Sequence, residues 1–460
     1  MTRIRVGARN HGVDDWRILP PEPITDLDTY LGIGGGEGLW KARRSDPRDV
    51  VDLVWRSGLR GRGGAGFPTG VKWQTIASVD PGQTRYVVCN AAEGEPGTFK
   101  DRAILRSNPY QVLEGIAIAC HAVGAVEAYI GIKASFTREL EVLYRAVDEI
   151  RESGLLEGIG LTVVRGPEDY LFGEEKALLE VIEGRDPLPR WYPPYLVGLH
   201  TGLVAGVGAG SAGPWEVANP TLVNNVETLA NIPSILRNGP DWFRRVGTDR
   251  SPGTMVFTVS GDTRVEGVFE LPLGVPLAVL VDGVAGGTDR PLKAVLPGAS
   301  NQPIPGELID TPAAFETLAE IGSGLGSGGF IVFDDSVCMA DVGRAYSRFL
   351  AEESCGQCPP CKLGCTSLAD MFERLETGDA DPYLLQEMAA WAERVTDANR
   401  CGLGAGERAL AAGILNRFSE ELASHIPGGC RVERRIQVAK LVDLEEGRFV
   451  TAPGRSERPD

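Results

Sequence analysis

The sequence predicts an α/β domain with a parallel sheet, followed by a smaller β-rich domain and a C-terminal helical bundle. Between residues 86 and 182, short apolar runs rich in β-branched residues alternate with segments of helical periodicity, a pattern typical of a parallel α/β layer. Beyond about residue 250, short strand-like runs follow one another closely, with turn residues between them. From residue 338 to about 425, strand signals disappear and helical periodicity dominates.

The first half of the chain is predicted to contain an N-terminal arm, a glycine-rich loop and alternating strands and helices. Residues 1–50 are polar and turn-rich, so we expect an irregular arm followed by a short helix. Residues 59–73 hold too many glycines for a regular element and are predicted to form a loop. Strands are predicted at 86–90, 128–132 and 163–164, and helices at 110–124, 135–153 and from about 170 onward.

The second half is predicted to contain short strands, then helices, then a charged tail. Strands are expected at 255–261, 267–272 and 330–333, and a helix around 383–391. The tail after residue 427 is expected to be disordered or to lie on a partner. The predicted organisation is an arm at 1–50, an α/β domain at 51–249, a β-rich domain at 250–333, a helical domain at 334–430 and a tail at 431–460.

Charge and hydropathy exclude several classes of protein. With 46 basic and 63 acidic side chains, the 460-residue chain carries a formal net charge of −17, which a nucleic acid would repel. No segment offers the ~18 consecutive apolar residues of a membrane span, and the first residues hold no signal-peptide core. We therefore expect a cytoplasmic chain that binds no nucleic acid and reaches a membrane only through partners.

The placement of the cysteines gives the strongest chemical signal. Five of the nine lie between residues 355 and 401, and Cys355, Cys358 and Cys361 are each separated by two residues. Three thiolates at this spacing on a turning backbone can face an iron–sulfur cube from one side, and a fourth from a distant segment can close it. The spacing favours a [4Fe–4S] cluster over zinc, which normally uses two separated C-x2-C pairs.

Two cysteines are candidates for the fourth ligand. Cys365 completes a ferredoxin-like run, but in ferredoxins that cysteine serves a second cluster, and this sequence has no second set. This comparison favours Cys401. The other four cysteines are isolated and are expected to be small buried apolar residues, and the four histidines show no metal-ligand spacing. The isolated cysteines are Cys89, Cys120, Cys338 and Cys430.

The glycine-rich loop and several polar segments are candidate parts of a site for a phosphate-bearing cofactor. Around Arg62 and Lys72, small residues let backbone N–H groups approach a ligand, although neither common nucleotide-loop pattern is present. The segment 224–228 offers amides and a hydroxyl at a predicted helix start, which suits either a phosphate or a helix cap. Four glutamates follow predicted strands, where carboxylates accept from ribose hydroxyls or sit in turns and helix starts. They are Glu93, Glu95, Glu174 and Glu175.

Together these motifs resemble the NADH-binding, FMN-containing subunit of respiratory complex I and its relatives in NAD-dependent formate dehydrogenases and bidirectional hydrogenases. The resemblance runs from about residue 50 to 430, with the motifs in the family's order. The matching segments are GLRGRGGAGFPTGVKW (58–73), NAAEGEPGTFKDR (90–102), YLFGEEKALLEVIEG (170–184), NPTLVNNVETLANIP (219–233), GSGLGSGGFIVFD (322–334), ESCGQCPPCKLG (353–364) and Cys401.

The resemblance implies a Rossmann-like flavin domain, a small β-grasp (SLBB) domain and a helical bundle that holds one [4Fe–4S] cluster. It implies that FMN is bound by Gly61, Arg62, Gly63, Lys72, Asn90, Glu93, Tyr170, Gly173, Glu174, Asn224, Asn225 and Thr228. It implies that NAD(H) is bound by Phe67, Glu95 and Glu175, and that the cluster ligands are Cys355, Cys358, Cys361 and Cys401.

The sequence departs from the family pattern at several pocket positions. Ala92 replaces a carboxylate expected to hydrogen-bond the flavin, and losing one such bond costs about 1–3 kcal/mol. Lys176 replaces a threonine, Tyr192 a lysine expected near the dinucleotide, and Tyr195 a phenylalanine. These changes bear on flavin occupancy and on the choice between NAD and NADP.

The resemblance implies that the chain exchanges hydride between NAD(H) and FMN and passes single electrons to or from the cluster, with no side-chain acid or base required. The expected partners are a [2Fe–2S] thioredoxin-like subunit and a larger iron–sulfur or molybdenum subunit. The departures at Ala92, Lys176 and Tyr192 motivate an alternative, in which the chain is a nucleotide-free electron relay or scaffold.

Overall fold

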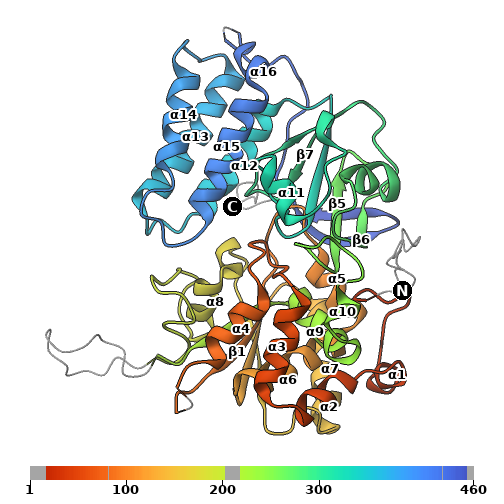
Figure 1. Ribbon diagram of the computed structural model, residues 1–460. Coiled ribbons are helices and arrows are strands. Elements are labelled where there is room, and N and C mark those ends of the chain that lie inside the picture. The colour runs from red at the N-terminus through yellow and green to blue at the C-terminus, as the bar shows by residue number, and fades with distance from the viewer. Residues whose placement is uncertain (1–16, 81, 202–217, 427, 453–460) are drawn as a thin grey trace, which may run out of the picture. The chain divides into compact units, whose positions relative to one another are not determined.

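The computed structural model describes residues 17–80, 82–201, 218–426 and 428–452, and the chain divides into two compact units (Figure 1). The first, which we call the α/β unit, comprises the described residues within 12–93 and 101–254. The second, the sheet–bundle unit, comprises the described residues within 94–100 and 255–460.

The α/β unit is built on a four-stranded parallel sheet with the strand order β3-β2-β1-β4. These strands are β1 (Tyr86–Ala91), β2 (Glu127–Lys133), β3 (Gly160–Gly166) and β4 (Thr221–Asn225). Strand β1 is buried along most of its length, in agreement with the apolar run from Tyr86 to Cys89 that precedes Asn90. The chain proceeds outward from β1 to β3 and then returns to the other side of β1 as β4, so the winding direction reverses between β1 and β4.

Helices that follow the strands confirm the predicted alternation. In this part of the chain they are α4 (Thr69–Ala77), α5 (Lys100–Ser107), α6 (Pro109–Val123), α7 (Thr137–Glu152), the 3-10 turn η1 (Tyr170–Gly173), α8 (Glu175–Ile182), α9 (Val226–Asn238) and α10 (Pro240–Phe243). Helix α6 is buried almost all round because it packs against α9 and contacts other helices. Its sequence is accordingly apolar on nearly every face.

The sequence predicts an irregular arm followed by one short helix over residues 1–50, and the described part, residues 17–50, holds more helix than that. This segment forms α1 (Leu27–Gly32), α2 (Glu37–Arg44) and the start of α3 (Pro47–Ser57), and α2 packs against α6 and α9. The helices form because Asp26 and Asp46 cap α1 and α3 and Pro47 occupies the first turn of α3. The expected arm at residues 1–16 lies outside the described residues.

The sheet–bundle unit begins with a five-stranded mixed sheet of order β6-β5-β9-β7-β8. Strands β5 and β9 are parallel, whereas β7 is antiparallel to β9 and to β8. The strands are β5 (Thr254–Gly261), β6 (Gly267–Pro272), β7 (Leu292–Pro297), β8 (Ile304–Pro305) and β9 (Gly329–Asp334), with η2 (Val279–Val284), η3 (Gly306–Leu308) and α11 (Phe315–Glu320) between them. One apolar core joins this sheet to α11 and η2, through residues such as Phe257, Leu280 and Leu318.

Five helices follow the mixed sheet and confirm the predicted helical region. They are α12 (Met339–Glu353), α13 (Pro359–Thr377), α14 (Leu384–Arg394), α15 (Leu403–Arg417) and α16 (Ser419–Ala423). Helices α12 to α15 lie side by side, and α13 contacts each of the other three (Figure 1).

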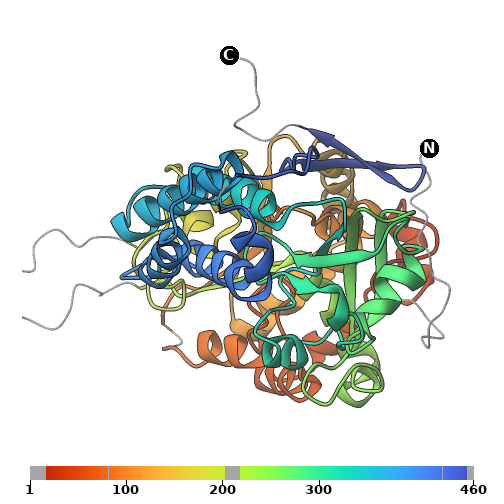
Figure 2. The ribbon, with the colours of Figure 1, turned by 90° about the horizontal axis from the view of Figure 1, so that it is seen from above.

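The expectation that the tail is disordered is wrong for residues 440–452, and the alternative that the tail lies on a partner stays a prediction. Strands β10 (Lys440–Glu445) and β11 (Arg448–Ala452) form an antiparallel hairpin, visible in Figure 2 as a two-stranded ribbon in the darkest blue. An isolated hairpin is marginal in water, and here the ring of Phe449 packs 5.5 Å from that of Phe99, measured between ring centroids. The rest of the expected tail, residues 453–460, lies outside the described residues.

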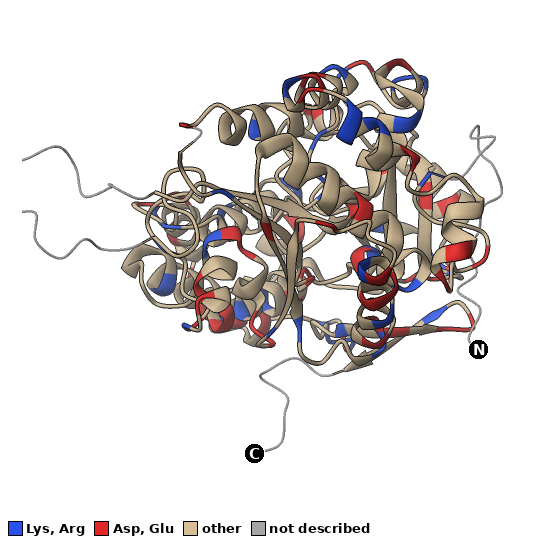
Figure 3. Ribbon diagram, turned by 90° about the horizontal axis from the view of Figure 1, so that it is seen from below, with Lys and Arg blue, Asp and Glu red and all other residues tan. Residues whose placement is uncertain are grey.

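Basic and acidic positions are interspersed along the ribbon in the view of Figure 3. Among the described residues, none of the helices is both long enough and apolar enough to cross a lipid bilayer.

Candidate functional site

In open parallel α/β sheets, ligands bind at the carboxyl ends of the two strands between which the winding direction reverses. In this sheet those strands are β1 and β4. Asn90 in β1 pairs in register with Asn225 in β4. Glu93 follows β1, and Thr228 lies in the first turn of α9 directly after β4. Sequence-predicted polar residues from two distant segments are thereby placed at the same edge of the sheet.

The glycine-rich loop is closed on itself and joined to this edge. The Gly61 amide donates to the Phe67 carbonyl at 2.8 Å, which closes the loop. The Arg62 amide donates to Thr228 Oγ1 at 2.9 Å. A Cβ on Gly63 would lie 3.1 Å from the Asn225 Cβ, so a larger residue here would press on β4. Gly64 has a φ of +122°, a conformation that only glycine adopts readily, and nothing lies near its missing side chain.

Arg62 differs from the expectation that its cation faces a negative ligand. Its guanidinium is completely buried and donates to the carbonyls of Arg60, Pro252 and Thr254 at 2.9–3.1 Å. It also lies 3.9 Å from Glu227, which is equally buried. Burial lowers the pKa of Arg62 to about 10. The structure therefore gives this side chain a role in holding the loop.

The asparagines of the predicted pocket also support one another. Asn90 donates to the Gly173 carbonyl at 2.7 Å, which ties β1 to η1. Asn224 accepts from the Trp73 indole at 2.8 Å. Asn225 accepts from the Glu227 amide at 3.0 Å and donates to Asp101 at 2.6 Å, so it caps α9.

Two of the acidic residues accept hydrogen bonds from backbone amides, and a third forms a partly exposed ion pair. Glu93 accepts from the amides of Asp101 and Arg102 at 3.0 and 3.3 Å. Glu174 caps α8 by accepting from two amides, and burial raises its pKa to about 7. Glu175 is partly exposed and pairs with Lys72 at 2.6 Å. Phe67 is 53% exposed, so this aromatic ring is accessible beside the closed loop.

Two departures from the family pattern have clear structural settings. Ala92 is buried in a small apolar cluster with Phe172 and Leu178, and its carbonyl would lie 2.9 Å from a Cβ added to Gly173. A carboxylate in place of the Ala92 methyl would have to leave this cluster. Lys176 lies 3.8 Å from Glu174 and so places its charge beside that carboxylate.

Glu95 belongs to the other unit. Its carboxylate accepts from the Ala299 amide at 2.7 Å, and a Cβ on Gly298 would lie 2.4 Å from the same oxygen. Gly298 therefore allows the close approach of Glu95 to the turn after β7.

The cysteine-rich segment lies where α12 ends and α13 begins. Cys355 lies between the two helices, Cys358 is the N-cap of α13, and Cys361 is in its first turn. The Arg400 amide donates to Cys358 Sγ at 3.3 Å, and its guanidinium donates to Gln357 at 2.8 Å. These bonds bring the segment that carries Cys401 to the N-terminus of α13.

The thiols differ in their readiness to become ligands. A hydrogen bond from Cys365, with the Ser354 hydroxyl and the Lys362 charge adding to it, lowers the pKa of Cys361. The thiol of Cys365 has its pKa raised by the same bond and by complete burial. Thiolates, amide-to-sulfur bonds and a helix N-terminus suit an anionic iron–sulfur cluster, so the residues present fit that group. Sequence reasoning missed Arg400 and Gln357, for which no spacing gave a signal.

The polar residues at the edge of β1 and β4 are typical of a nucleotide-binding α/β domain, and the cysteines around the start of α13 are typical of an iron–sulfur domain. One chain carries both. Residues 54–234 match the family model of the Nuo51 FMN-binding domain, and residues 341–425 match the NADH-ubiquinone oxidoreductase-F iron-sulfur binding region.

Curated relatives match along most of their length. The F-type subunit of NADH-quinone oxidoreductase from Streptomyces coelicolor is 40% identical, with 92% of this chain and 95% of the relative covered. A second such F-type subunit, from Rhizobium meliloti, is 39% identical, with 87% and 94% covered. The HndC subunit of the NADP-reducing hydrogenase of Solidesulfovibrio fructosivorans is 37% identical, with 92% and 84% covered.

A solved structure is similar as well. A chain of the NAD+-reducing [NiFe]-hydrogenase in the air-oxidized state matches with a TM-score of 0.75 and 34% identity, over 88% of this chain and 67% of that chain. The protein belongs to the family of F-type subunits of NADH-quinone oxidoreductase, and it is an oxidoreductase component with FMN- and [4Fe–4S]-binding regions. The family favours this redox function over the alternative of a nucleotide-free relay.

Proposed function

We propose that the chain takes hydride from NADH or returns it to NAD at the switch point of the α/β unit, and exchanges single electrons through the cysteine segment with partner subunits. One observation carries the proposal: the glycine loop is hydrogen-bonded to the start of α9 at the carboxyl edge of β1 and β4, in the same chain as three closely spaced thiols. FMN, when bound, supplies the conversion between two-electron hydride chemistry and single-electron transfer.

The proposed flavin pocket uses backbone and side-chain donors with different roles. Gly61, Gly63 and Gly173 allow close backbone approach, and the N-terminus of α9 favours a phosphate. Lys72 supplies the positive charge that a phosphate needs. It pairs with Glu175 in this structure, and it would contact the phosphate either together with Glu175 or in place of it. The complete proposed set is Gly61, Arg62, Gly63, Lys72, Asn90, Glu93, Tyr170, Gly173, Glu174, Asn224, Asn225 and Thr228 for FMN, and Phe67, Glu95 and Glu175 for the nicotinamide nucleotide.

We propose Cys355, Cys358, Cys361 and Cys401 as the cluster ligands. The Arg400 bonds to the start of α13 support Cys401 as the fourth ligand, and the complete burial of Cys365 inside α13 argues against the alternative. Cys401→Ser should lower iron in the purified protein, whereas Cys365→Ser should leave it unchanged. Loss of iron in the Cys365 variant alone would reverse this choice.

Several finer features of the assembly belong to the same proposal. The mixed sheet of β5 to β9 is proposed to be the SLBB β-grasp domain, within the predicted division into five regions. The partners are proposed to be a [2Fe–2S] thioredoxin-like subunit and a larger iron–sulfur or molybdenum subunit, in the cytoplasm. Relatives named as subunits of NADH-quinone oxidoreductase and of an NADP-reducing hydrogenase support a multi-subunit setting.

The deciding experiment is an anaerobic visible spectrum of the chain, purified with its co-expressed partners, before and after NADH and then NADPH. Bleaching of a flavin band by one nucleotide is expected and identifies the preferred cofactor. Iron–sulfur absorbance without flavin, and without a response to either nucleotide, would overturn the proposal. Lys72→Met is expected to weaken FMN binding by about 10–100-fold, because a charge-assisted hydrogen bond contributes about 1.5–3 kcal/mol.

A further inference from the structure

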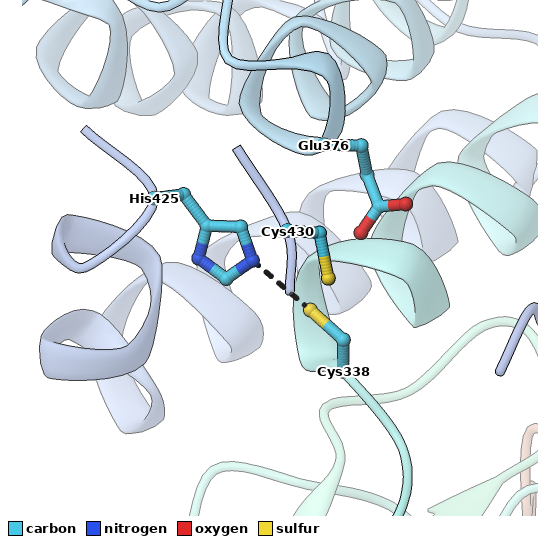
Figure 4. Close-up of side chains that lie close together, drawn as sticks. All are labelled: Cys338, Glu376, His425 and Cys430. Carbon is cyan, nitrogen blue, oxygen red and sulfur yellow. Dashed lines mark hydrogen bonds between the residues drawn. The ribbon is translucent and has the colours of Figure 1, made fainter. Parts of the chain in front are cut away.

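A second group of potential metal ligands lies in the sheet–bundle unit, outside the segment proposed to hold the iron–sulfur cluster. One ligand atom from each of Cys338, Glu376, His425 and Cys430 lies within 4.8 Å of every other (Figure 4). Cys338 and Cys430 are isolated in the sequence, and the four residues are spread over 93 positions of the chain. The fold gathers them from the start of α12, the last turn of α13 and the chain that follows α16.

The histidine is oriented as a metal ligand would be. His425 Nδ1 lies 2.8 Å from the Glu421 carbonyl, which can only accept, so Nδ1 carries the hydrogen. In the neutral ring Nε2 therefore presents its lone pair, and it lies 3.2 Å from Cys338 Sγ. A backbone carbonyl that orients the far side of the ring is the usual support for a metal-bound histidine.

The carboxylate has one atom that the protein does not satisfy. Glu376 is only 6% exposed, and Arg435 pairs with its Oε2. Its Oε1 is buried and receives no hydrogen bond from a nitrogen or oxygen donor among the described residues, and the thiols of Cys430 and Cys338 are the donors beside the carboxylate. In Figure 4 the carboxylate is turned toward the sulfur of Cys430. Thiols are weak donors, so a bound cation would satisfy this buried oxygen better than they do.

The backbone around Cys430 is held in place for such a site. The Cys430 amide donates to the Glu376 carbonyl at 2.9 Å, and the Val432 amide donates to Cys430 Sγ at 3.4 Å. Gly429 has a φ of +72°, and a Cβ there would lie 2.7 Å from the Glu376 carbonyl oxygen. The glycine turn thus allows Cys430 to approach the end of α13.

We propose that Cys338, Glu376, His425 and Cys430 bind one zinc ion in a closed structural site. Two thiolates, an imidazole and a carboxylate are zinc donors, and tetrahedral zinc places neighbouring donor atoms about 3.3–3.8 Å apart, so only a small contraction is needed. Binding releases the two thiol protons and oxidises nothing. Zinc with two thiolates and a carboxylate carries a charge of −1, which the Arg435 guanidinium beside Glu376 balances.

The site adds a link between elements that polar contacts already join, since the Ile436 amide donates to Asp341 in α12 and Arg435 pairs with Glu376 in α13. It ties the beginning of α12 to the end of α13 and to the chain leading into β10. Because the four protein ligands fill a tetrahedron, no position remains for a substrate, and the ion stabilises the fold. This inference is independent of the proposed hydride exchange.

The test uses the full chain with its cofactors, purified anaerobically, dialysed against metal-free buffer and analysed for zinc and iron by mass spectrometry. About one zinc per chain is expected in the unmodified protein. The double variant Cys338→Ser/Cys430→Ser should lose zinc and keep its iron, and the control Cys120→Ser, another buried cysteine, should keep both. Zinc retained by the double variant, or nearly absent from the unmodified protein, would overturn the proposal.

Zinc-edge X-ray absorption of the unmodified protein decides the question even if the double variant does not fold. Two sulfur scatterers near 2.3 Å, with nitrogen or oxygen completing four ligands, are expected. A shell of oxygen and nitrogen alone would contradict the site. So would a disulfide between Cys338 and Cys430 found by peptide mapping of the anaerobic protein.

Discussion

Single buried charged residues determine much of the local order in this protein. Arg62, Glu227 and Glu407 are all completely buried, and each has a hydrogen-bond or ionic partner. Burying a charge is tolerated only with such partners, since the loss of hydration is otherwise uncompensated. At the residue scale, therefore, the glycine loop and the bundle both depend on specific polar contacts.

Glu407 should make stability depend on pH. Ser347 donates to it at 2.7 Å, and burial raises its pKa to about 8 from a usual value near 4.5. The pKa of Glu407 is higher in the folded state than in the unfolded state, so folding favours the protonated carboxyl. The stability that this preference contributes is fully present below about pH 4.5 and is lost as the pH rises through 8. Each pH unit in that window costs about 1.4 kcal/mol.

When the pH is raised from 6 to 8.5, the melting temperature of the variant Glu407→Gln should therefore fall less than that of the unmodified protein. Melting temperatures of the cofactor-loaded chain measure the effect, and Glu387→Gln, at an exposed position, is the matched control. Equal pH slopes for the Glu407 variant and the unmodified protein would show that Glu407 is not the titrating group.

At the scale of elements, close backbone approach determines how the helices of the α/β unit pack. A Cβ added to Gly115 in α6 would lie 2.1 Å from the Leu229 carbonyl oxygen in α9. Gly115→Ala should destabilise the protein by about 1–3 kcal/mol, because neither backbone can move easily. Gly32→Ala in α1, where nothing lies within 4 Å of the added Cβ, should be neutral or slightly stabilising. Chemical denaturation measures both, and equal effects would contradict the packing explanation.

The C-terminal hairpin is held by an aromatic contact and by Glu266, whose amide donates to the Gly447 carbonyl at 2.9 Å and whose carboxylate accepts from the Phe449 amide at 2.8 Å. Phe449 is 8% exposed and packs near Phe99, whereas its neighbour Val450 is 40% exposed. Phe449→Ala should increase hydrogen exchange throughout β10 and β11, since a two-stranded hairpin is marginal without packing. Val450→Ala should change exchange little. Unchanged protection in the Phe449 variant would mean that other contacts hold the hairpin.

At the scale of the whole molecule, the two groups of candidate cofactor residues are carried mainly by different units. The residues proposed to bind FMN lie in the α/β unit, and the thiols proposed to bind the cluster lie in the sheet–bundle unit. Cys358→Ser should therefore lower iron while flavin remains, and Lys72→Met should lower flavin while iron remains. Flavin and iron content per chain, measured after anaerobic purification, test this separation. Loss of both cofactors in either variant would show that the two sites depend on each other.

The alternation of strands and helices, the β-rich region, the helical region and the candidate cofactor residues could all be predicted from the sequence. Local signals suffice for these because periodicity, caps, glycine loops and cysteine spacing act over short stretches of chain. The sequence predicts only one short helix before residue 50, whereas α1 forms behind the Asp26 cap and α2 forms by packing on α6 and α9, and it does not predict the C-terminal hairpin.

Only the tertiary structure decided how distant residues act together. It turned the Arg62 guanidinium inward to three carbonyls, although its sequence position suggested a ligand contact. It also brought Cys338 Sγ and His425 Nε2 to 3.2 Å from each other, although the two residues are 87 positions apart in the chain. Spacing along the chain carries no information about such contacts, because they arise from how packed helices and loops meet in space.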